Sequence, residues 1–241
     1  MNDVRGSTKE EVKLIKAIQK ATGAYDNGYI GNQTLSDIDI ELEADCFPLN
    51  VELYGMPTII SKNIVPFIPN SVLSNNCISG SFNDGYQPCS ILVQNGLVKC
   101  WSSCHYPEYS ETVIYKDIYG NVRCDRITHI SNTNTIKVSE IDFAVGGMGL
   151  LGLYSPKEEG FVGKFSDVLR KTNHTVLGYR NGMFYGVYFK NMTASQINKM
   201  CSEKFKFQYA ILLDGGHIAA INGEVNKINV YQKQLYAIKF Y

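Results

Sequence analysis

The chain lacks a charge surplus of either sign and a long hydrophobic run. Its 23 basic and 23 acidic side chains cancel over 241 residues. Because neutralising nucleic-acid phosphates requires surplus Lys and Arg, this balance argues against general nucleic-acid binding. The longest apolar runs, such as residues 210–213, are far shorter than a membrane span. The sequence therefore predicts neither a nucleic-acid partner nor a membrane partner.

An apolar N-terminal stretch is also missing. Residues 1–7 have no hydrophobic run, which excludes a signal peptide there, and the chain is expected in the cytoplasm unless cell lysis releases it. Seven cysteines, an odd number, then indicate mostly free thiols in a reducing compartment. The Cys100-x3-Cys104 spacing is poor for zinc, and no glycine loop has the Walker or dinucleotide spacing. We expect no metal and no cofactor.

Residues 1–44 are predicted to form a short helical segment. Ser7 and Glu10 are spaced as a capping box, and apolar residues follow at helical spacing. The turn at 26–35, with Asn27 inserted, resembles the Asp-Gly-x-x-Gly-x-x-Thr turn of the peptidoglycan-binding domain of cell-wall hydrolases. The resemblance makes the cell wall a candidate partner and implies a bacterial or phage source.

Residues 45–241 are predicted to form a strand-rich domain, so the expected fold class is α+β. Asn-Gly pairs favour tight hairpin turns because both positions tolerate positive φ. Such turns are predicted at 95–96, 181–182 and 222–223, and a Gly-Asn turn at 120–121. One helix is expected after Thr193, which can cap residues 194–201.

Three glycine-bearing loops, 76–85, 143–151 and 210–217, each follow apolar residues of an expected strand. Glycine lets backbone amides approach an anion because no Cβ intervenes. The candidate ligand-binding residues of these loops are Ser79, Gly80, Ser81, Gly146, Gly147, Gly215 and Gly216. Asp214 ends an apolar strand, where it can serve as a general acid or base, or cap the glycine turn.

In this order, the loops resemble the phosphodiester glycosidase family, the N-acetylglucosamine-1-phosphodiester alpha-N-acetylglucosaminidase-like domain. The resemblance spans residues from about 55 to 241. It implies a strand-rich domain that hydrolyses a phosphodiester attached to a sugar. The matching motifs are Ser79-Gly80-Ser81-Phe82, Ala144-Val145-Gly146-Gly147, His174-Thr175-Val176-Leu177-Gly178, Asn191-Met192-Thr193 and Leu213-Asp214-Gly215-Gly216-His217.

The resemblance implies catalytic roles for Asp214, His174 and His217, and adds Thr175 to the ligand-binding residues. Two histidines can supply a base and an acid near neutral pH. The motif regions are therefore expected around one cavity. The chain departs from the family where Ser79 replaces Asn, His174 replaces Arg and His217 replaces Gly. Arg binds phosphate through two bonds and a neutral His binds it weakly, so the phosphate-binding position is altered.

Three functions remain open at this point. The first is hydrolysis of a sugar-linked phosphodiester, including a cell-wall or phage-related substrate. The second is a non-catalytic protein that sequesters a phosphodiester, sugar or nucleotide-like ligand, for example a phage protein that holds a host signalling nucleotide. The third is a structural part of a phage particle. Recovery of a candidate phosphodiester in intact or cleaved form would distinguish the first two.

Overall fold

The computed structural model describes residues 4–5, 29–30, 58–67, 73–103, 109–133, 137–223 and 227–241. The chain divides into two compact units, Met1–Leu53 and Tyr54–Tyr241. In the first unit, β1 (Val4–Arg5) and β2 (Tyr29–Ile30) pair antiparallel. The other residues of the predicted helical, wall-binding-like segment lie outside the described ranges, so that segment and its boundary at 44–45 stay predictions.

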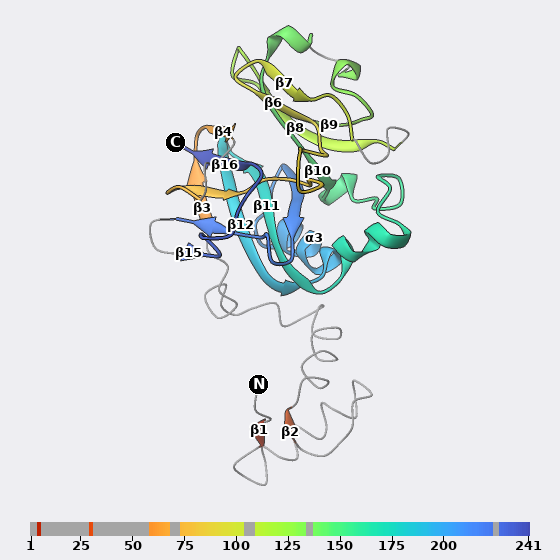
Figure 1. Cartoon of the computed structure of the whole chain (residues 1–241), viewed down its shortest axis with the longest axis vertical. Helices are drawn as coiled ribbons and strands as arrows, with labels where there is room; N and C mark the ends of the chain where they lie inside the picture. Colours follow the sequence, from red (N-terminus) through yellow and green to blue (C-terminus); the bar gives the residue numbers. More distant parts are fainter. Residues whose placement is uncertain are drawn as a thin grey trace. The chain divides into compact units, whose positions relative to one another are not determined.

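The larger sheet of the second unit is antiparallel. Its described strands run in the order β3, β12, β11, β13, β10, β6 and β7, with β8 paired to β10 and β9 paired to β8. Their bounds are β3 (Thr58–Ser61), β6 (Leu92–Gln94), β7 (Leu97–Cys100), β8 (Glu111–Asp117), β9 (Val122–Ile127), β10 (Ile141–Gly149), β11 (Thr172–Arg180), β12 (Met183–Met192) and β13 (Tyr209–Gly215). In Figure 1 the hairpins β6–β7 and β8–β9 lie together at one end of this unit.

Turn residues explain these hairpins. Asn95 and Gly96 between β6 and β7, and Asn181 and Gly182 between β11 and β12, have positive φ, as the sequence predicted. The predicted hairpin at 120–121 joins β8 to β9. The fourth prediction is displaced: Asn222 ends strand β14 (Ile221–Asn222) and pairs with Lys227 of β15 (Lys227–Ile228). The connection therefore begins after Asn222.

A smaller antiparallel sheet packs on the larger one. Its described order is β15, β14, β5, β16 and β4, with β4 (Ile64–Phe67), β5 (Cys77–Ser79) and β16 (Ala237–Phe240). One buried cluster joins both sheets: Ile78, Ile221 and Phe240 from the smaller sheet pack with Leu177 and Phe184 from the larger. Burial of this apolar surface is the main force that holds the sheets face to face.

Helix α3 (Ala194–Glu203) is the single α-helix within the described ranges. The predicted cap is present: the amide of Gln196 donates to the Thr193 hydroxyl, and the Gln196 side chain accepts from the Thr193 amide. The strand-rich class is confirmed, and this unit is mostly β because one short helix accompanies two sheets. No helix in the described ranges is long and apolar enough to cross a membrane.

Candidate functional site

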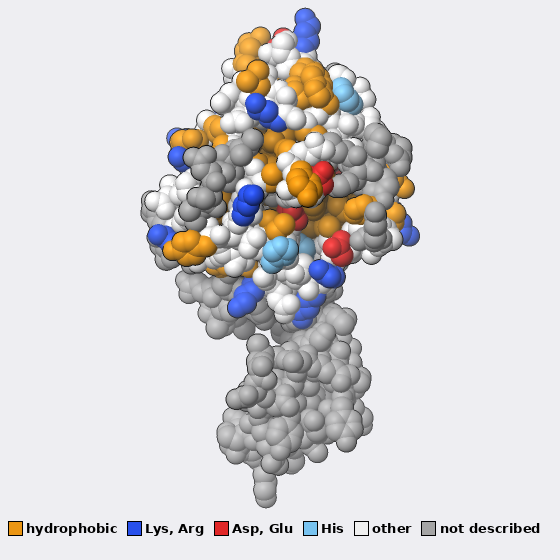
Figure 2. All heavy atoms as spheres, viewed as in Figure 1, with side chains coloured by type: hydrophobic (Ala, Val, Ile, Leu, Met, Phe, Trp, Pro, Cys, Tyr) orange, Lys and Arg blue, Asp and Glu red, His pale blue; other side chains and the backbone are white. Residues whose placement is uncertain are grey.

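Two cavities lie side by side in the larger unit and share Asp167, Val168 and Asp214. The first, of about 200 Å³, is also lined by Phe82, Asn83, Cys89, Ser90, Ser103, Ser110, Glu111, Glu159, Gly160, Phe161 and Phe165. The second, of about 190 Å³, is also lined by Arg170, Thr172, His174, Gly215, Gly216, His217 and Ile218. On the face shown in Figure 2, acidic, basic and histidine side chains gather in the middle of this unit.

Asp214 stands on the wall that the cavities share, one residue before the end of β13. The side-chain amide of Asn83 donates to Asp214 Oδ2 at 3.0 Å, and the backbone amide of Gly215 donates to Oδ1 at 2.8 Å. Burial raises the pKa of Asp214 to about 7; the Gly215 amide opposes the rise and the negative charge of Asp167 adds to it. Asp214 can therefore accept and release a proton near neutral pH.

Glu111, the first residue of β8, is buried in the wall of the first cavity. Its Oε2 accepts from the Ile91 amide at 2.8 Å. A Cβ on Gly146 would lie 2.6 Å from the Glu111 carboxyl carbon, so glycine at 146 leaves room for this carboxyl. Burial raises the pKa of Glu111 to about 8, although hydrogen bonds from Ile91 and Ser90 oppose the rise. Glu111 is therefore mostly protonated at neutral pH.

Glu159 reaches the same cavity from the segment between β10 and β11. Its Oε1 accepts from the Thr112 hydroxyl, and its Oε2 accepts from the Gly149 amide at 2.8 Å. Burial raises its pKa to about 7, against these hydrogen bonds and the positive charge of Arg126. Both carboxylate oxygens are held by the sheet, which fixes Glu159 in the cavity wall.

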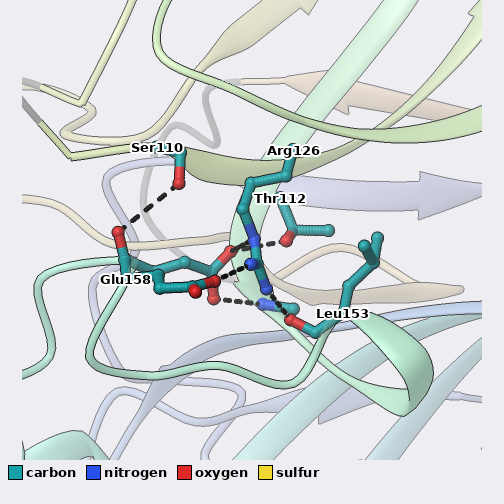
Figure 3. A network of polar contacts seen from close by, with 7 residues as sticks. Ser110, Thr112, Arg126, Leu153 and Glu158 are labelled. Carbon is teal, nitrogen blue, oxygen red and sulfur yellow. Dashed lines mark hydrogen bonds and ion pairs between the residues drawn. The ribbon is translucent and has the colours of Figure 1, made fainter.

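Arg126 of β9 anchors this segment to the sheet. Its guanidinium donates to the Glu158 carboxylate and to the Leu153 carbonyl, and its Nε lies 3.9 Å from Glu159 Oε1. Figure 3 shows the guanidinium between these groups, with Ser110 donating to the Glu158 carbonyl beside it. The network fixes the start of the segment that continues into the aromatic wall of the first cavity.

The second cavity brings together five residues that the sequence singled out: His174, Asp214, Gly215, Gly216 and His217. His174 pairs with Gly215 in the β11–β13 register, and its imidazole is fully buried. Burial lowers the pKa of His174 to about 4, so the ring is neutral at neutral pH. His217 is exposed at the rim. Asp214 and the two histidines thus line the same cavity, and their catalytic roles stay proposals.

The other predicted residues do not line either cavity, apart from Phe82 of the first motif. The Ser79 and Thr175 hydroxyls lie 2.9 Å apart, and Thr175 donates to the Asp214 carbonyl at 3.3 Å. Ser81 donates to Ser90 at 3.0 Å. A Cβ on Gly80 would collide with the Tyr236 ring, and one on Gly147 would collide with the Leu212 carbonyl. The motifs therefore do not all surround one cavity, contrary to the prediction from the sequence, and the ligand-binding role predicted for these residues remains untested.

Several wall residues were missed by the sequence analysis. The Asn83-Asp84-Gly85 sequence predicts a turn, and Asn83 does accept from the Gly85 amide, but it also donates to Asp214. Glu111, Glu159 and Arg170 belong to no motif that the sequence analysis used. The available signal for Glu111 was an acidic residue just before the apolar run 113–115 of β8. Among the described residues, no three His, Cys, Asp or Glu side chains are placed to hold a metal ion.

Solved structures share this fold. The catalytic domain of zebrafish N-acetylglucosamine-1-phosphodiester alpha-N-acetylglucosaminidase, auto-inhibited by its pro-peptide, matches with a TM-score of 0.53 at 12% identity, over 83% of this chain and 85% of that one. A hypothetical protein from Synechocystis matches with a TM-score of 0.51 at 10% identity, over 79% of this chain and 60% of that one. No protein-family model and no curated protein matches the sequence. The similarity establishes a distant fold relationship.

Proposed function

We propose that the unit Tyr54–Tyr241 hydrolyses a sugar-linked phosphodiester, with Asp214 as the general base. The observation that carries this proposal is the position of Asp214 on the wall between two cavities, with a pKa of about 7. A base whose pKa lies near the working pH combines a useful ionised fraction with a strong drive to accept a proton. Asn83 and the Gly215 amide hold the carboxyl in one orientation.

In the proposed reaction, Asp214 takes a proton from a water molecule. The water oxygen bonds to the anomeric carbon of the sugar, and the bond from that carbon to the phosphate oxygen breaks. The electron pair leaves with the phosphate, so the products are a free sugar and a phosphate monoester. A phosphate group is a stable anion at neutral pH, so no side chain needs to protonate it. The neutral ring of His174 is consistent with a reaction that requires no acid there.

The substrate class is supported by two features. One solved structure that shares this fold is, by its description, an enzyme of a sugar phosphodiester. The first cavity has three phenylalanines, Phe82, Phe161 and Phe165, together with hydroxyl and carboxyl groups. Aromatic faces with a few polar groups suit a sugar, which has both apolar and hydroxyl surfaces. A cell-wall or phage-related glycan, which the sequence makes a candidate, belongs to this class.

A second candidate is a domain that binds the same ligand without cleaving it. The burial and neutrality of His174, where the family carries Arg, favour this alternative, because one expected phosphate-binding cation is missing. The ligand would then be a phosphodiester, a sugar or a nucleotide-like molecule. Both candidates use the same two cavities, so the fate of the ligand distinguishes them.

The test uses a methyl phosphodiester of N-acetylglucosamine 1-phosphate in water labelled with heavy oxygen. Mass spectrometry of the products is expected to find the label in the sugar. Label in the phosphate would show attack at phosphorus and contradict the proposed reaction. Full recovery of the intact diester, bound to the protein, would support the non-catalytic alternative. Protein carrying Asp214→Asn, treated in parallel, controls for contaminating activity.

A further inference from the structure

The two cavities differ in the charges that line them. Arg170 and His217 line the second cavity, whereas the described lining of the first contains no Lys, Arg or His. Glu111 and Glu159 instead line the first cavity. The described lining of the first cavity therefore offers an anion no cationic partner, whereas the second cavity offers Arg170 beside the shared Asp167 and Asp214.

Backbone amides of the glycine loops are already used inside the protein. The Gly215 amide donates to Asp214 Oδ1, and the Gly216 amide donates to the Asn173 carbonyl at 2.8 Å. The amides of Gly80 and Gly146 donate to the carbonyls of Tyr236 and Ile91. These four N–H groups cannot also bind an anion without giving up those bonds, so a charged side chain that lines the second cavity is the stronger candidate for that role.

Arg170 has the required position and freedom. Arg170 lies two residues before β11, the strand that carries His174. The Nε2 of His174 lies 3.4 Å from the Arg170 carbonyl. The positive charge of Arg170 contributes to lowering the pKa of His174, so the charge acts on a ring that lines the second cavity. The side chain is exposed, and it forms no ion pair with any residue that the structure describes. Its guanidinium remains available to a ligand.

We propose that the second cavity is a phosphoryl-binding subsite in which Arg170 binds the anion, with His217 at its rim, and that the uncharged sugar occupies the first cavity. Arg170 thereby supplies the guanidinium that the altered position at His174 does not. Two parallel N–H donors suit a phosphoryl group, as a histidine ring does not. The identity of the anion as a phosphodiester rests on the proposed function. This arrangement puts the sugar and the phosphate on opposite sides of Asp214.

The test measures binding of inorganic phosphate and of dimethyl phosphate by isothermal titration. Arg170→Gln removes one positive charge at the cavity, and Lys190→Gln removes one from the exposed surface of β12. We expect Arg170→Gln to weaken both anions at least about tenfold, Arg170→Lys to weaken them less, and Lys190→Gln to change them less than about twofold. Because Arg170 is exposed, the variants are expected to unfold at the wild-type temperature, which is checked by thermal denaturation.

Equal anion binding by wild type and Arg170→Gln would overturn the inference. The inference would also be overturned if Arg170→Gln weakened binding of the neutral methyl glycoside of N-acetylglucosamine as much as it weakened binding of the anions. Anion binding that depends on Arg170, without cleavage of any phosphodiester, would leave the subsite standing and remove the proposed hydrolysis. If Arg170→Gln hydrolyses the phosphodiester with the kcat and KM of the wild type, the proposed hydrolysis stands and the Arg170 subsite is ruled out.

Discussion

The two cavities share three wall residues but are built in different ways. The second is assembled mainly from the ends of β11 and β13 and the residues that flank them, where His174 and Gly215 face each other in register. The first depends on a long connection between β10 and β11, which a side-chain network anchors to the sheet. The second cavity therefore depends on the pairing of two neighbouring strands, whereas the network ties the connection to β8, β9 and β10 through side chains. Mutations should therefore affect the cavities independently, except at the shared residues Asp167, Val168 and Asp214.

The largest effect is expected at the shared wall. Asp214→Asn keeps the shape of the side chain and removes its capacity to accept a proton. Turnover of the phosphodiester should fall by roughly 10²–10⁴, the range for a positioned base, while binding of inorganic phosphate changes little. Steady-state kinetics and titration measure the two quantities.

Asp167→Asn is the matched control, because it removes an exposed carboxylate from the same wall. Its turnover should stay within about tenfold of wild type, since a screened surface charge has a modest effect. Full turnover in folded Asp214→Asn would show that Asp214 serves only to cap the glycine turn.

The acidic wall of the first cavity should make stability depend on pH. The pKa values of Glu111, Glu159 and Asp214 are raised to about 8, 7 and 7, so the folded state holds protons that the unfolded state has released. The free energy of unfolding should therefore fall as pH rises from about 5 to 8. Glu111→Gln should make this slope shallower by on the order of 1 kcal/mol per pH unit, because one proton of difference between the folded and unfolded states contributes about 1.4 kcal/mol per pH unit.

Chemical denaturation of wild type and Glu111→Gln at several pH values measures this slope. Asp125→Asn, a carboxyl on β9 outside both cavities, is the control and should keep the wild-type slope. A free energy of unfolding that rises over this pH range in wild type would contradict the charge state assigned to the cavity wall.

Arg126→Gln should separate the cavities. Without the guanidinium, Glu158 and the Leu153 carbonyl lose their bonds to β9. The segment that leads to the aromatic wall of the first cavity is then no longer held against the sheet. KM for the sugar phosphodiester should rise about tenfold, as expected when charge-assisted bonds of about 1.5–3 kcal/mol no longer position the wall. Phosphate binding in the second cavity should stay within about twofold.

Arg123→Gln, on the same strand but outside this network, should keep the wild-type KM. Loss of phosphate binding in Arg126→Gln, with the fold intact, would show that the two cavities are not independent.

The smallest effect is expected behind the shared wall. Ser79→Ala removes the hydroxyl that lies 2.9 Å from Thr175 and that accepts from the Ala220 amide. Because the group is buried, the free energy of unfolding should fall by about 1 kcal/mol or somewhat more. If Ser79 only supports the wall, phosphate affinity stays within about twofold; a tenfold loss would restore its predicted role in ligand binding. Thr175→Val gives the partner measurement.

Local signals in the sequence predicted the local structure well. The Asn-Gly pairs at 95–96 and 181–182 required positive φ at both positions and so fixed two hairpins. Thr193 and Gln196 satisfied each other's backbone amides and so fixed the start of α3. The hairpin expected around 222–223 is present as β14 and β15, but its connection begins only after Asn222, because Asn222 itself pairs in the sheet, with Lys227 and Cys77.

The site could be predicted only in part. The apolar run that ends at Leu213 predicted that Asp214 lies at the end of a strand. The order of the motifs suggested that Asp214, His174 and His217 belong to one site, and the three residues line the same cavity. Asn83 was assigned to a turn because the sequence shows its neighbours in the chain and not the carboxyl 131 positions away that it contacts. Glu111 and Glu159 were missed for the same reason.

The sequence by itself determined the strand-rich character, the tight turns, the capped helix and the candidate role of Asp214, because each depends on residues close together in the chain. Only the tertiary structure shows that the glycines leave room for a ring, a carboxyl or a backbone carbonyl, and that their amides already donate hydrogen bonds inside the protein. It also shows that Arg170 and His174 line the same cavity. The charge states also depend on the tertiary structure, because burial raises the pKa of Asp214 to about 7 and lowers that of His174 to about 4. Desolvation depends on everything packed around a side chain, and that environment exists only once distant strands have come together.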